Sequence, residues 1–451
     1  MSTQESFVIS PAIIPRADHN ISRSHISENA LKVLYRLKSA GYESYLVGGG
    51  VRDLLLGREP KDFDVATDAQ PEQVHTLFRN CRIIGRRFRL AHVQFGREII
   101  EVATFRANQP AAHGNDDDAG AGAGDAHHDN GRILRDNTYG TLEQDVFRRD
   151  FTVNALYYDI RDFSLKDYVD GLTDLRTGTL RLIGDPETRY REDPVRMLRA
   201  VRFVSKLGFR LHPDTAAPIA SLSPLLADIP PARLFEEILK LFLYGFGAQA
   251  FASLRHHGLF SHLFPRTDAV LDTEEQGFSR IFIAKALAST DARVTEDKPV
   301  TPAFLFAALL WEPVRRQAAA LEVQGLHPGE ALRRAAGEIV SEQIARVALP
   351  RRFATPMIEI YQMQPRFTQR EGKRPLRLLA HPRFRAAYDF LVLRAEAGEV
   401  EPELVQWWTQ IQAAGADEQR DMLTAAPGTT AAGGQRRSRR RRRRHETSRP
   451  V

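Results

Sequence analysis

Two aspartates near the start of the chain have the residue type and spacing that phosphate chemistry requires. Asp62 and Asp64 lie two residues apart in Asp62–Val65, a short segment that is typical of a β-strand. On a strand, residues i and i+2 share a face, so the sequence predicts two adjacent carboxylates. Like charges at that distance repel unless a cation lies between them, and Mg²⁺ or Mn²⁺ prefers oxygen ligands. The pair therefore predicts a divalent metal site with Asp62 and Asp64 as its catalytic carboxylates.

The elements before this pair would position a nucleotide beside it. Tyr45–Val47 is an apolar run that predicts a strand, and Val51–Leu56 predicts a short helix that ends at Gly57. Gly48 and Gly49 lie in the glycine turn between them. A strand that ends in glycines and leads into a helix directs free N–H groups at its ligand, which is most often phosphate. A phosphate-binding turn followed closely by a carboxylate pair indicates nucleotidyl transfer.

The segment Leu46–Asp64, LVGGGVRDLLLGREPKDFD, resembles the first motif of the class II nucleotidyltransferases. That family comprises CCA-adding tRNA nucleotidyltransferases and bacterial poly(A) polymerases. The resemblance covers about Ser27 to Gly208 through specific motifs and is looser elsewhere. It implies ATP as a substrate and Arg52, inside this motif, as a nucleotide-binding residue.

Arg82–Arg97 and Glu98–Phe105 predict two further strands of the same sheet. Glu101 lies among apolar residues in the second of them, where a carboxylate is costly to bury without a partner. Two interpretations stay open for Glu101. It is either a third metal carboxylate beside Asp62 and Asp64, or an ion-paired core residue.

Three cations and one aromatic residue occur together in the first of these strands as Arg86, Arg87, Phe88 and Arg89. Such a set suits phosphate contact and base stacking on RNA, and a charged edge strand is the alternative. The surrounding segment Ile83–Val93, IIGRRFRLAHV, resembles the one that marks bacterial poly(A) polymerases among their CCA-adding relatives.

The segment Arg148–Leu156, RRDFTVNAL, resembles the second motif of the family. Asp150 offers a fixed acceptor for a ribose hydroxyl or for the metal shell and is the third catalytic candidate, while Arg149 is a cation that can meet a triphosphate. The resemblance implies that this motif distinguishes ribose from deoxyribose and that Asn154 contacts the nucleotide. A buried Arg–Asp pair that ties two elements together is the alternative.

Gly184–Gly208 matches the third and fourth motifs of the family. Asp193 is placed to cap a helix whose first residue is Pro194, and arginines recur every three residues along one flank from Arg196 to Arg202. By resemblance, the E-D-x-x-R residues would read adenine, although a solvated helix with an arginine-rich side fits the same periodicity. The nucleotide-binding residues predicted here are Glu192, Asp193, Arg196 and Arg199.

Length and composition set the broad class. The 451 residues are enough for two to four domains, and one cysteine, Cys81, excludes an internal disulfide and indicates a reducing compartment. We find no signal peptide and no apolar run near the ~20 residues that cross a bilayer. The sequence predicts a soluble, cytoplasmic protein with no membrane contact.

The net charge of +6 is concentrated at the end of the chain. Residues 433–451 hold nine Arg and one Glu, a local charge of +8 that leaves about −2 for the remainder. Such a tail is too charged to fold, and it predicts contact with a polyanion such as RNA, together with RNA-decay protein partners. A solvated extension without function is the alternative.

The pattern predicts an α+β protein in which a nucleotidyltransferase head, a small mixed sheet with flanking helices, is followed by an all-α neck and body. From Pro231, apolar residues recur at helical spacing as a wide buried face. The predicted divisions are a flexible arm (1–26), the head (27–178, with a disordered loop at 107–130), the neck (179–245), an RNA-binding body (246–416) and a disordered tail (417–451).

These features predict template-independent polyadenylation of single-stranded RNA 3′ ends. The RNA 3′-hydroxyl would attack the α-phosphorus of ATP by two-metal catalysis, and pyrophosphate would leave. A CCA-adding enzyme uses the same chemistry and is the second interpretation. A non-catalytic RNA-binding adaptor is the third, and the intact carboxylates and glycines argue against it.

Overall fold

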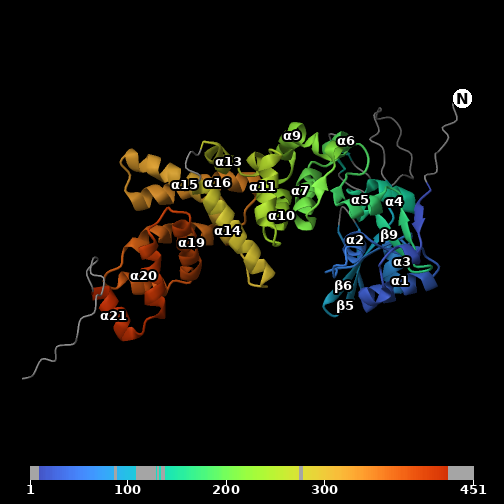
Figure 1. Ribbon diagram of the computed structural model, residues 1–451, viewed down its shortest axis with the longest axis horizontal. Coiled ribbons are helices and arrows are strands. Elements are labelled where there is room, and N and C mark those ends of the chain that lie inside the picture. Colours follow the sequence, from blue (N-terminus) through green and yellow to red (C-terminus); the bar gives the residue numbers. More distant parts are fainter. Residues whose placement is uncertain are drawn as a thin grey trace, which may run out of the picture. The chain divides into compact units, whose positions relative to one another are not determined.

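The computed structural model describes residues 10–85, 89–107, 128–129, 132–133, 138–273 and 278–424, which are drawn in colour in Figure 1. The chain divides into two compact units, residues 1–358 (unit 1) and residues 359–451 (unit 2). The candidate site lies in unit 1.

A mixed sheet of eight strands forms the first part of unit 1, in the order β1-β10-β9-β2-β3-β6-β5-β4 within the described residues. Neighbours such as β2 and β3 run antiparallel, whereas β3 and β6 run parallel. The strands are β1 (Ala12–Ile14), β2 (Ser44–Val47), β3 (Asp64–Thr67), β4 (Cys81–Ile84), β5 (Leu90–Phe95), β6 (Glu98–Thr104), β9 (Leu156–Asp159) and β10 (Leu165–Asp167).

Helices α1 (Glu28–Ser39) and α3 (Pro71–Leu77) pack on one face of this sheet. Ser27 caps α1, because its hydroxyl accepts the backbone N–H groups of Asn29 and Ala30 at 3.1 and 3.4 Å. The apolar side of α1 is buried against β2, β3 and β6.

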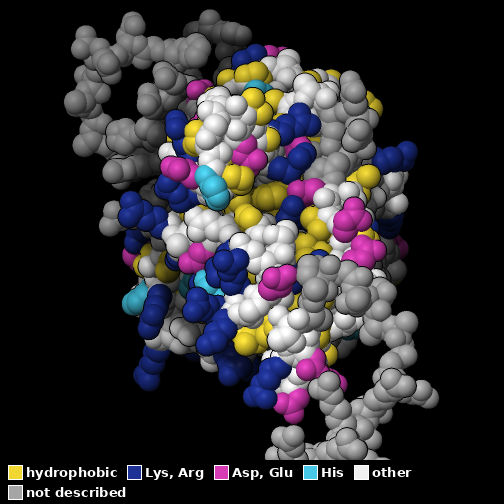
Figure 2. All heavy atoms as spheres, turned by 90° about the vertical axis from the view of Figure 1, so that its left-hand side faces the viewer, with side chains coloured by type: hydrophobic (Ala, Val, Ile, Leu, Met, Phe, Trp, Pro, Cys, Tyr) yellow, Lys and Arg dark blue, Asp and Glu magenta, His cyan; other side chains and the backbone are white. Residues whose placement is uncertain are grey.

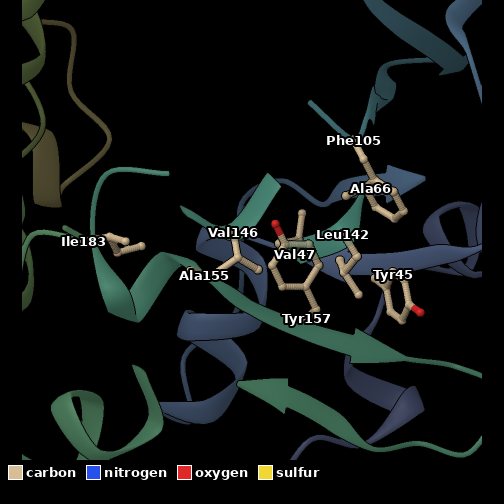
Figure 3. Packing of buried hydrophobic residues seen from close by; sticks show 9 residues of the cluster. All are labelled: Tyr45, Val47, Ala66, Phe105, Leu142, Val146, Ala155, Tyr157 and Ile183. Carbon is tan, nitrogen blue, oxygen red and sulfur yellow. The ribbon is translucent and has the colours of Figure 1, made fainter. Parts of the chain in front are cut away.

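Helix α4 (Leu142–Arg148) covers the other face, which is the face that carries the site. Thr141 and Gln144 form a reciprocal capping box at its start. Figure 3 shows how side chains of α4 and of the strands pack together in this layer. The cluster consists of Tyr45, Val47, Ala66, Phe105, Leu142, Val146, Ala155, Tyr157 and Ile183.

Two sequence predictions about the sheet are corrected. Ala12–Ile14, expected in a flexible arm, pair with β10 as an edge strand. The single strand expected over Arg82–Arg97 is the antiparallel pair β4 and β5, because Gly85 takes a positive φ of 84° that turns the chain. Helix α5 (Gly171–Thr177) follows β10.

The rest of unit 1 is mainly helical, and α10 buries the apolar face that its sequence predicts. The α-helices there, besides α5, are α2 (Gly49–Leu55), α6 (Pro186–Glu192), α7 (Val195–Leu207), α8 (Pro213–Ala216), α9 (Ile219–Leu222), α10 (Pro231–Phe242), α11 (Gly247–His256), α12 (Phe260–Leu263), α13 (Pro265–Asp272), α14 (Phe278–Thr295), α15 (Pro302–Val323) and α16 (Pro328–Val347). The 3-10 helices are η1 (Arg16–Asp18), η2 (Arg23–His25), η3 (Thr152–Asn154) and η4 (Ser223–Asp228). The short strand pairs are β7 (His128–Asp129) with β8 (Arg132–Ile133), and β11 (Thr179–Leu180) with β12 (Arg210–Leu211).

Helix α17 (Arg351–Met363) leads into unit 2. Unit 2 has a hydrophobic core of its own that includes Trp408 and Phe367. Its further elements are η5 (Gln364–Thr368), α18 (Arg374–Leu379), α19 (Phe384–Glu396), α20 (Pro402–Ala413) and α21 (Ala416–Thr424). Helix α21 corrects the expectation that the disordered tail begins at residue 417. Within the described residues, no helix combines the length and apolar character needed to cross a membrane.

Most of the predicted loop at 107–130 and of the arginine-rich tail lies outside the described residues. The loop prediction is corrected at its end, where residues 128–129 form strand β7.

Candidate active site

Strand pairing aligns four residues in a row across the sheet. Val47 on β2 is opposite Asp64 on β3, Asp64 is opposite Glu101 on β6, and Glu101 is opposite His92 on β5. Side chains at paired positions share a face of a sheet. The register therefore gathers Asp64, Glu101 and His92 on the face that α4 covers.

The glycine turn lies directly beside Asp64. Gly48 has a positive φ of 76° and is the N-cap of α2, a helix that begins at Gly49, earlier than predicted. A Cβ atom on Gly48 would lie 3.3 Å from Asp64 Oδ2 and 3.9 Å from Arg149 Nη1. Three predicted site residues from separate segments thus meet at one point, and any side chain at Gly48 would crowd them.

Asp62 precedes the strand instead of lying in it, because β3 begins at Asp64. Phe63 is buried, as the alternation of the sequence predicts, while Asp62 is exposed. Burial, and then the negative charges of Glu101 and Asp62, raise the pKa of Asp64 to about 7, against a smaller opposing effect of Arg149. Asp64 therefore lies in an excess of negative charge that a cation would relieve.

The donor chemistry at this point fits a hard divalent cation, since the carboxylates of Asp62 and Asp64 supply oxygen ligands. Among the described residues, however, no three His, Cys, Asp or Glu side chains are gathered closely enough to hold a metal. Glu101 Oε2 instead lies 3.4 Å from His92 Nε2, and the Glu101 side chain is 42% exposed. The two aspartates are thus candidate ligands, and Glu101 as the third stays a prediction.

Asp150 lies at the end of a chain of buried polar contacts. Its carboxylate accepts hydrogen bonds from Arg199 Nε at 2.8 Å and from Asn154 Nδ2 at 3.4 Å. Burial alone would raise the pKa of Asp150, but the adjacent Arg199 guanidinium holds it at about 2. Asn154 in turn accepts from Arg52 Nη1 at 2.7 Å. Asp150 is thus held as a carboxylate by protein groups.

Arg52 is buried, and besides Asn154 it donates to Asp53 through Nε and Nη2 at 2.8 and 2.7 Å. The predicted nucleotide-binding arginine is therefore engaged by protein groups in this structure. Its contacts give it a role in positioning the motif that contains Asn154.

Arg149 has two of its edges bound inside the protein. Its Nε donates to the Tyr157 hydroxyl at 2.6 Å, and its Nη2 donates to Asp145 Oδ2 at 3.0 Å. Its remaining edge, Nη1, is the atom near Gly48. Contact with Tyr157 and Asp145 outweighs burial and raises the pKa of Arg149, so the residue stays a cation.

The predicted adenine-reading residues lie between α6 and α7. Glu192 accepts hydrogen bonds from Arg189 and Arg196, both at 2.9 Å. Asp193 accepts from Arg233 at 2.7 Å and ends α6, while Pro194 is the N-cap of α7 and lies just before its first residue, so the predicted start is displaced by one position. The structure gathers this group where the end of α6 meets the start of α7.

The sequence analysis missed four residues that organise the site. Arg189 donates to the carbonyls of Arg148 and Arg149 at 2.8 and 2.6 Å and so joins α6 to the end of α4. The other three are Asp145, Tyr157 and His92. The spacing of Asp145 was a detectable signal in the sequence. Asp145 precedes Arg148 by three residues and Arg149 by four, and residues at these spacings are neighbours on a helix.

The prediction of RNA contact at Arg86, Arg87 and Phe88 lies outside the described residues. Arg89 is described, and its guanidinium forms an ion pair with Glu72.

The fold is similar to that of solved tRNA nucleotidyltransferases. A crystal structure of the Bacillus stearothermophilus CCA-adding enzyme in complex with CTP aligns with a TM-score of 0.56 and 27% identity over 85% of this chain and 81% of that one. A Thermotoga maritima CCA-adding enzyme complexed with tRNA aligns with a TM-score of 0.58 and 17% identity over 91% of this chain and 89% of that one. The fold and the site define a nucleotidyltransferase.

Sequence relatives narrow this class. The chain is 52% identical to poly(A) polymerase I of Salmonella typhi over 91% of its length and 88% of the relative, and 48% identical to that of Haemophilus influenzae over 91% and 90%. The CCA-adding enzyme of Geobacillus stearothermophilus is 38% identical over 52% of this chain and 54% of its own. This chain belongs to the bacterial poly(A) polymerase family.

Three protein-family models match successive parts of the chain. Residues 44–181 match the poly A polymerase head domain, residues 208–271 match the probable RNA and SrmB-binding site of polymerase A, and residues 324–445 match the polymerase A arginine-rich C-terminus.

Proposed function

We propose that this chain adds adenosine residues to single-stranded RNA 3′ ends, without a template, from ATP and with release of pyrophosphate. The observation that carries this conclusion is 52% identity to a poly(A) polymerase I over 91% of the chain. As a nucleotidyltransferase it takes a nucleotide and a divalent metal, and we assign ATP as the nucleotide and Mg²⁺, or Mn²⁺, as the metal.

The turn at Gly48 and Gly49 binds the triphosphate through backbone N–H groups at the start of α2, which lack partners within the helix. Arg149 adds its Nη1 edge from the opposite side. The support is the convergence of Gly48, Asp64 and Arg149 within van der Waals distance of one point. A triphosphate bound with a divalent cation would offset the repulsion around Asp64 through that cation, while the charge of the phosphates would meet Arg149.

Asp62 and Asp64 hold the metal, with phosphate and water oxygens completing its shell. When bound, Mg²⁺ supplies charge that stabilises the attacking and leaving oxygens of an in-line displacement. The elevated pKa of Asp64 supports this assignment, because the carboxylate gains most when a cation offsets the charges of Glu101 and Asp62. In this proposal Glu101 would be the third carboxylate ligand, beside the phosphate and water oxygens.

Asp150 and Asn154 contact the ribose, and the α6–α7 group reads the base. In this structure the Asp150 carboxylate accepts hydrogen bonds from Arg199 Nε and Nη2, from Asn154 Nδ2 and from the Phe151 N–H, so a ribose hydroxyl would take the place of one of these donors. Glu192, Asp193 and Arg196 offer both acceptors and donors to the adenine edge, with Arg199 alongside them.

RNA reaches the site along basic surfaces, which we assign to the predicted helical body and to the tail. In unit 2, a group of exposed cations includes Lys373, Arg374 and Arg377. Figure 2, which views the left-hand side of Figure 1, shows Lys and Arg side chains gathered over its lower left part. Basic groups of this kind bind phosphates without sequence preference. The match of residues 208–271 to the probable RNA and SrmB-binding site of polymerase A supports RNA contact where the predicted body begins. We also infer that RNA-decay proteins bind the tail. The single cysteine of the chain supports a reducing, cytoplasmic compartment.

The test offers purified protein a 3′-hydroxyl RNA primer and each nucleoside triphosphate separately. We expect long, adenosine-only products with ATP and little extension with CTP, UTP or GTP. A ladder that stops after three additions and needs CTP before ATP would establish the CCA-adding alternative. Retention of RNA without any incorporation would establish the adaptor alternative.

A further inference from the structure

Asp145 is a buried carboxylate surrounded by donors, next to the site but outside its predicted residues. Its side chain is 1% exposed. It accepts hydrogen bonds from Arg148 Nε at 2.9 Å, from Arg149 Nη2 at 3.0 Å and from the Tyr157 hydroxyl at 2.5 Å. Burial alone would raise the pKa of Asp145, but Arg149 and Arg148 hold it at about 2. Asp145 is therefore a permanent anion.

Tyr157 is the second contact that fixes the Arg149 side chain. Its hydroxyl donates to Asp145 and accepts from Arg149 Nε, and the guanidinium carbon lies 5.1 Å from the centre of its ring. The Nε and Nη2 atoms of Arg149 are thus bound to protein groups. The Nη1 atom has no hydrogen bond among the described residues and faces Gly48.

The contacts of Arg149 with Asp145 and Tyr157 keep Arg149 from pairing with Asp64. Asp64 Oδ2 and Arg149 Nη1 both lie within 4 Å of a Cβ position on Gly48, so a free arginine would reach the carboxylate. A direct Arg–Asp ion pair is a strong charge-assisted contact. It would take the Asp64 carboxylate from a metal and the guanidinium from a phosphate at the same time.

We propose that Asp145 and Tyr157 are positioning residues that hold Arg149 off Asp64 with its Nη1 edge directed at the phosphate-binding turn. They touch no substrate and act through Arg149. This inference rests on the proposed function, in which Arg149 meets the triphosphate and Asp64 binds the metal.

The chain offers a matched control with the same three residue types. Asp159 is buried, Arg161 Nη2 donates to Asp159 Oδ2 at 2.7 Å and to the Tyr45 hydroxyl at 2.8 Å, and the guanidinium lies 5.5 Å from the Tyr45 ring centre. Asp159 pairs with Tyr45 in the β2–β9 ladder, at the far end from Val47 and Asp64. Changes in this second trio remove the same kind of bond without altering a contact of Arg149, although the Tyr45 ring packs edge-to-face on Tyr157 with 6.1 Å between the ring centres.

The experiment compares Tyr157→Phe and Asp145→Asn with Tyr45→Phe and Asp159→Asn in the full-length protein, with an RNA primer and MgATP. We expect Tyr157→Phe to raise the KM for ATP and the half-saturating Mg²⁺ concentration by about tenfold each, because a charged group loses one hydrogen bond. Asp145→Asn should have a larger effect. The controls should stay within about twofold, and unfolding temperatures would show whether each variant folds.

A double-mutant cycle with Arg149→Met identifies the route of the effect. If Tyr157 acts through Arg149, adding Tyr157→Phe to Arg149→Met should leave the KM for ATP unchanged. An increased KM in Arg149→Met combined with a normal KM in Tyr157→Phe would overturn the positioning role and leave the proposed function intact. A normal KM in Arg149→Met would instead overturn the phosphate contact in the proposed function.

Discussion

Replacing Asp64 with asparagine should stabilise the metal-free protein while abolishing its activity. The side chain keeps its shape and loses its charge, so the repulsion from Glu101 and Asp62 disappears. Burial and these two carboxylates raise the pKa of Asp64 from 3.8 to about 7. An ionised Asp64 therefore lowers the free energy of unfolding at neutral pH when no cation is bound.

The sign and size of the effect follow from linkage between protonation and folding. The folded state binds the Asp64 proton more tightly than the unfolded chain. The loss of unfolding free energy caused by ionised Asp64 is therefore absent below pH 3.8, and it grows until the pH passes about 7. One pKa unit corresponds to about 1.4 kcal/mol, so the full cost is about 4 kcal/mol. The part that develops above about pH 5.5 is about 2 kcal/mol.

The assay is urea unfolding of wild type and Asp64→Asn in EDTA at about pH 5.5 and about pH 8. We expect the variant to be more stable at both pH values and its advantage to be about 2 kcal/mol larger at the higher one. Added Mg²⁺ should stabilise wild type and leave the variant unchanged, because only a folded carboxylate site binds the ion. Asp214→Asn, at a side chain that is 78% exposed, is the control.

An equal difference in stability at the two pH values would refute the reasoning, because Asp64 would then titrate alike in the folded and unfolded states. A Mg²⁺ response retained in Asp64→Asn would refute its assignment as a metal ligand.

Three further predictions test other parts of the site. Asp62→Ala should reduce nucleotide addition by about 10³-fold or more with the fold intact, and activity within tenfold of wild type would contradict its metal role. Glu101→Ala should cause a comparable loss of turnover if Glu101 completes the metal shell, whereas normal turnover with reduced unfolding temperature would make it a structural residue paired with His92. Deleting residues 435–451 should weaken RNA binding most at low salt and leave turnover at saturating primer intact, and equal salt dependence of binding with and without the tail would show that the tail does not contact RNA.

Local patterns in the sequence predicted the elements that depend on local interactions. The capping residue Ser27 and the apolar residues at helical spacing in Glu28–Ser39 are local signals that account for α1. The apolar run before the glycines predicted β2, and the periodicity after Pro231 predicted α10. Boundaries failed where one residue changed the backbone direction, as Gly85 does between β4 and β5. The edge strand β1 was missed because its partner, β10, lies far along the chain.

The sequence by itself determined which chemistry the chain carries. Glycine turns, paired carboxylates and the RRDFT segment can each be recognised from residue types and spacings within a few positions. The tertiary structure decided which of these residues are available to a substrate. Sheet register placed Glu101 opposite both Asp64 and His92, and folding buried Arg52 against Asn154. It also surrounded Arg149 with Asp145 and Tyr157. Such partners come from separate elements, so only three-dimensional packing determines whether an arginine faces a substrate or another side chain.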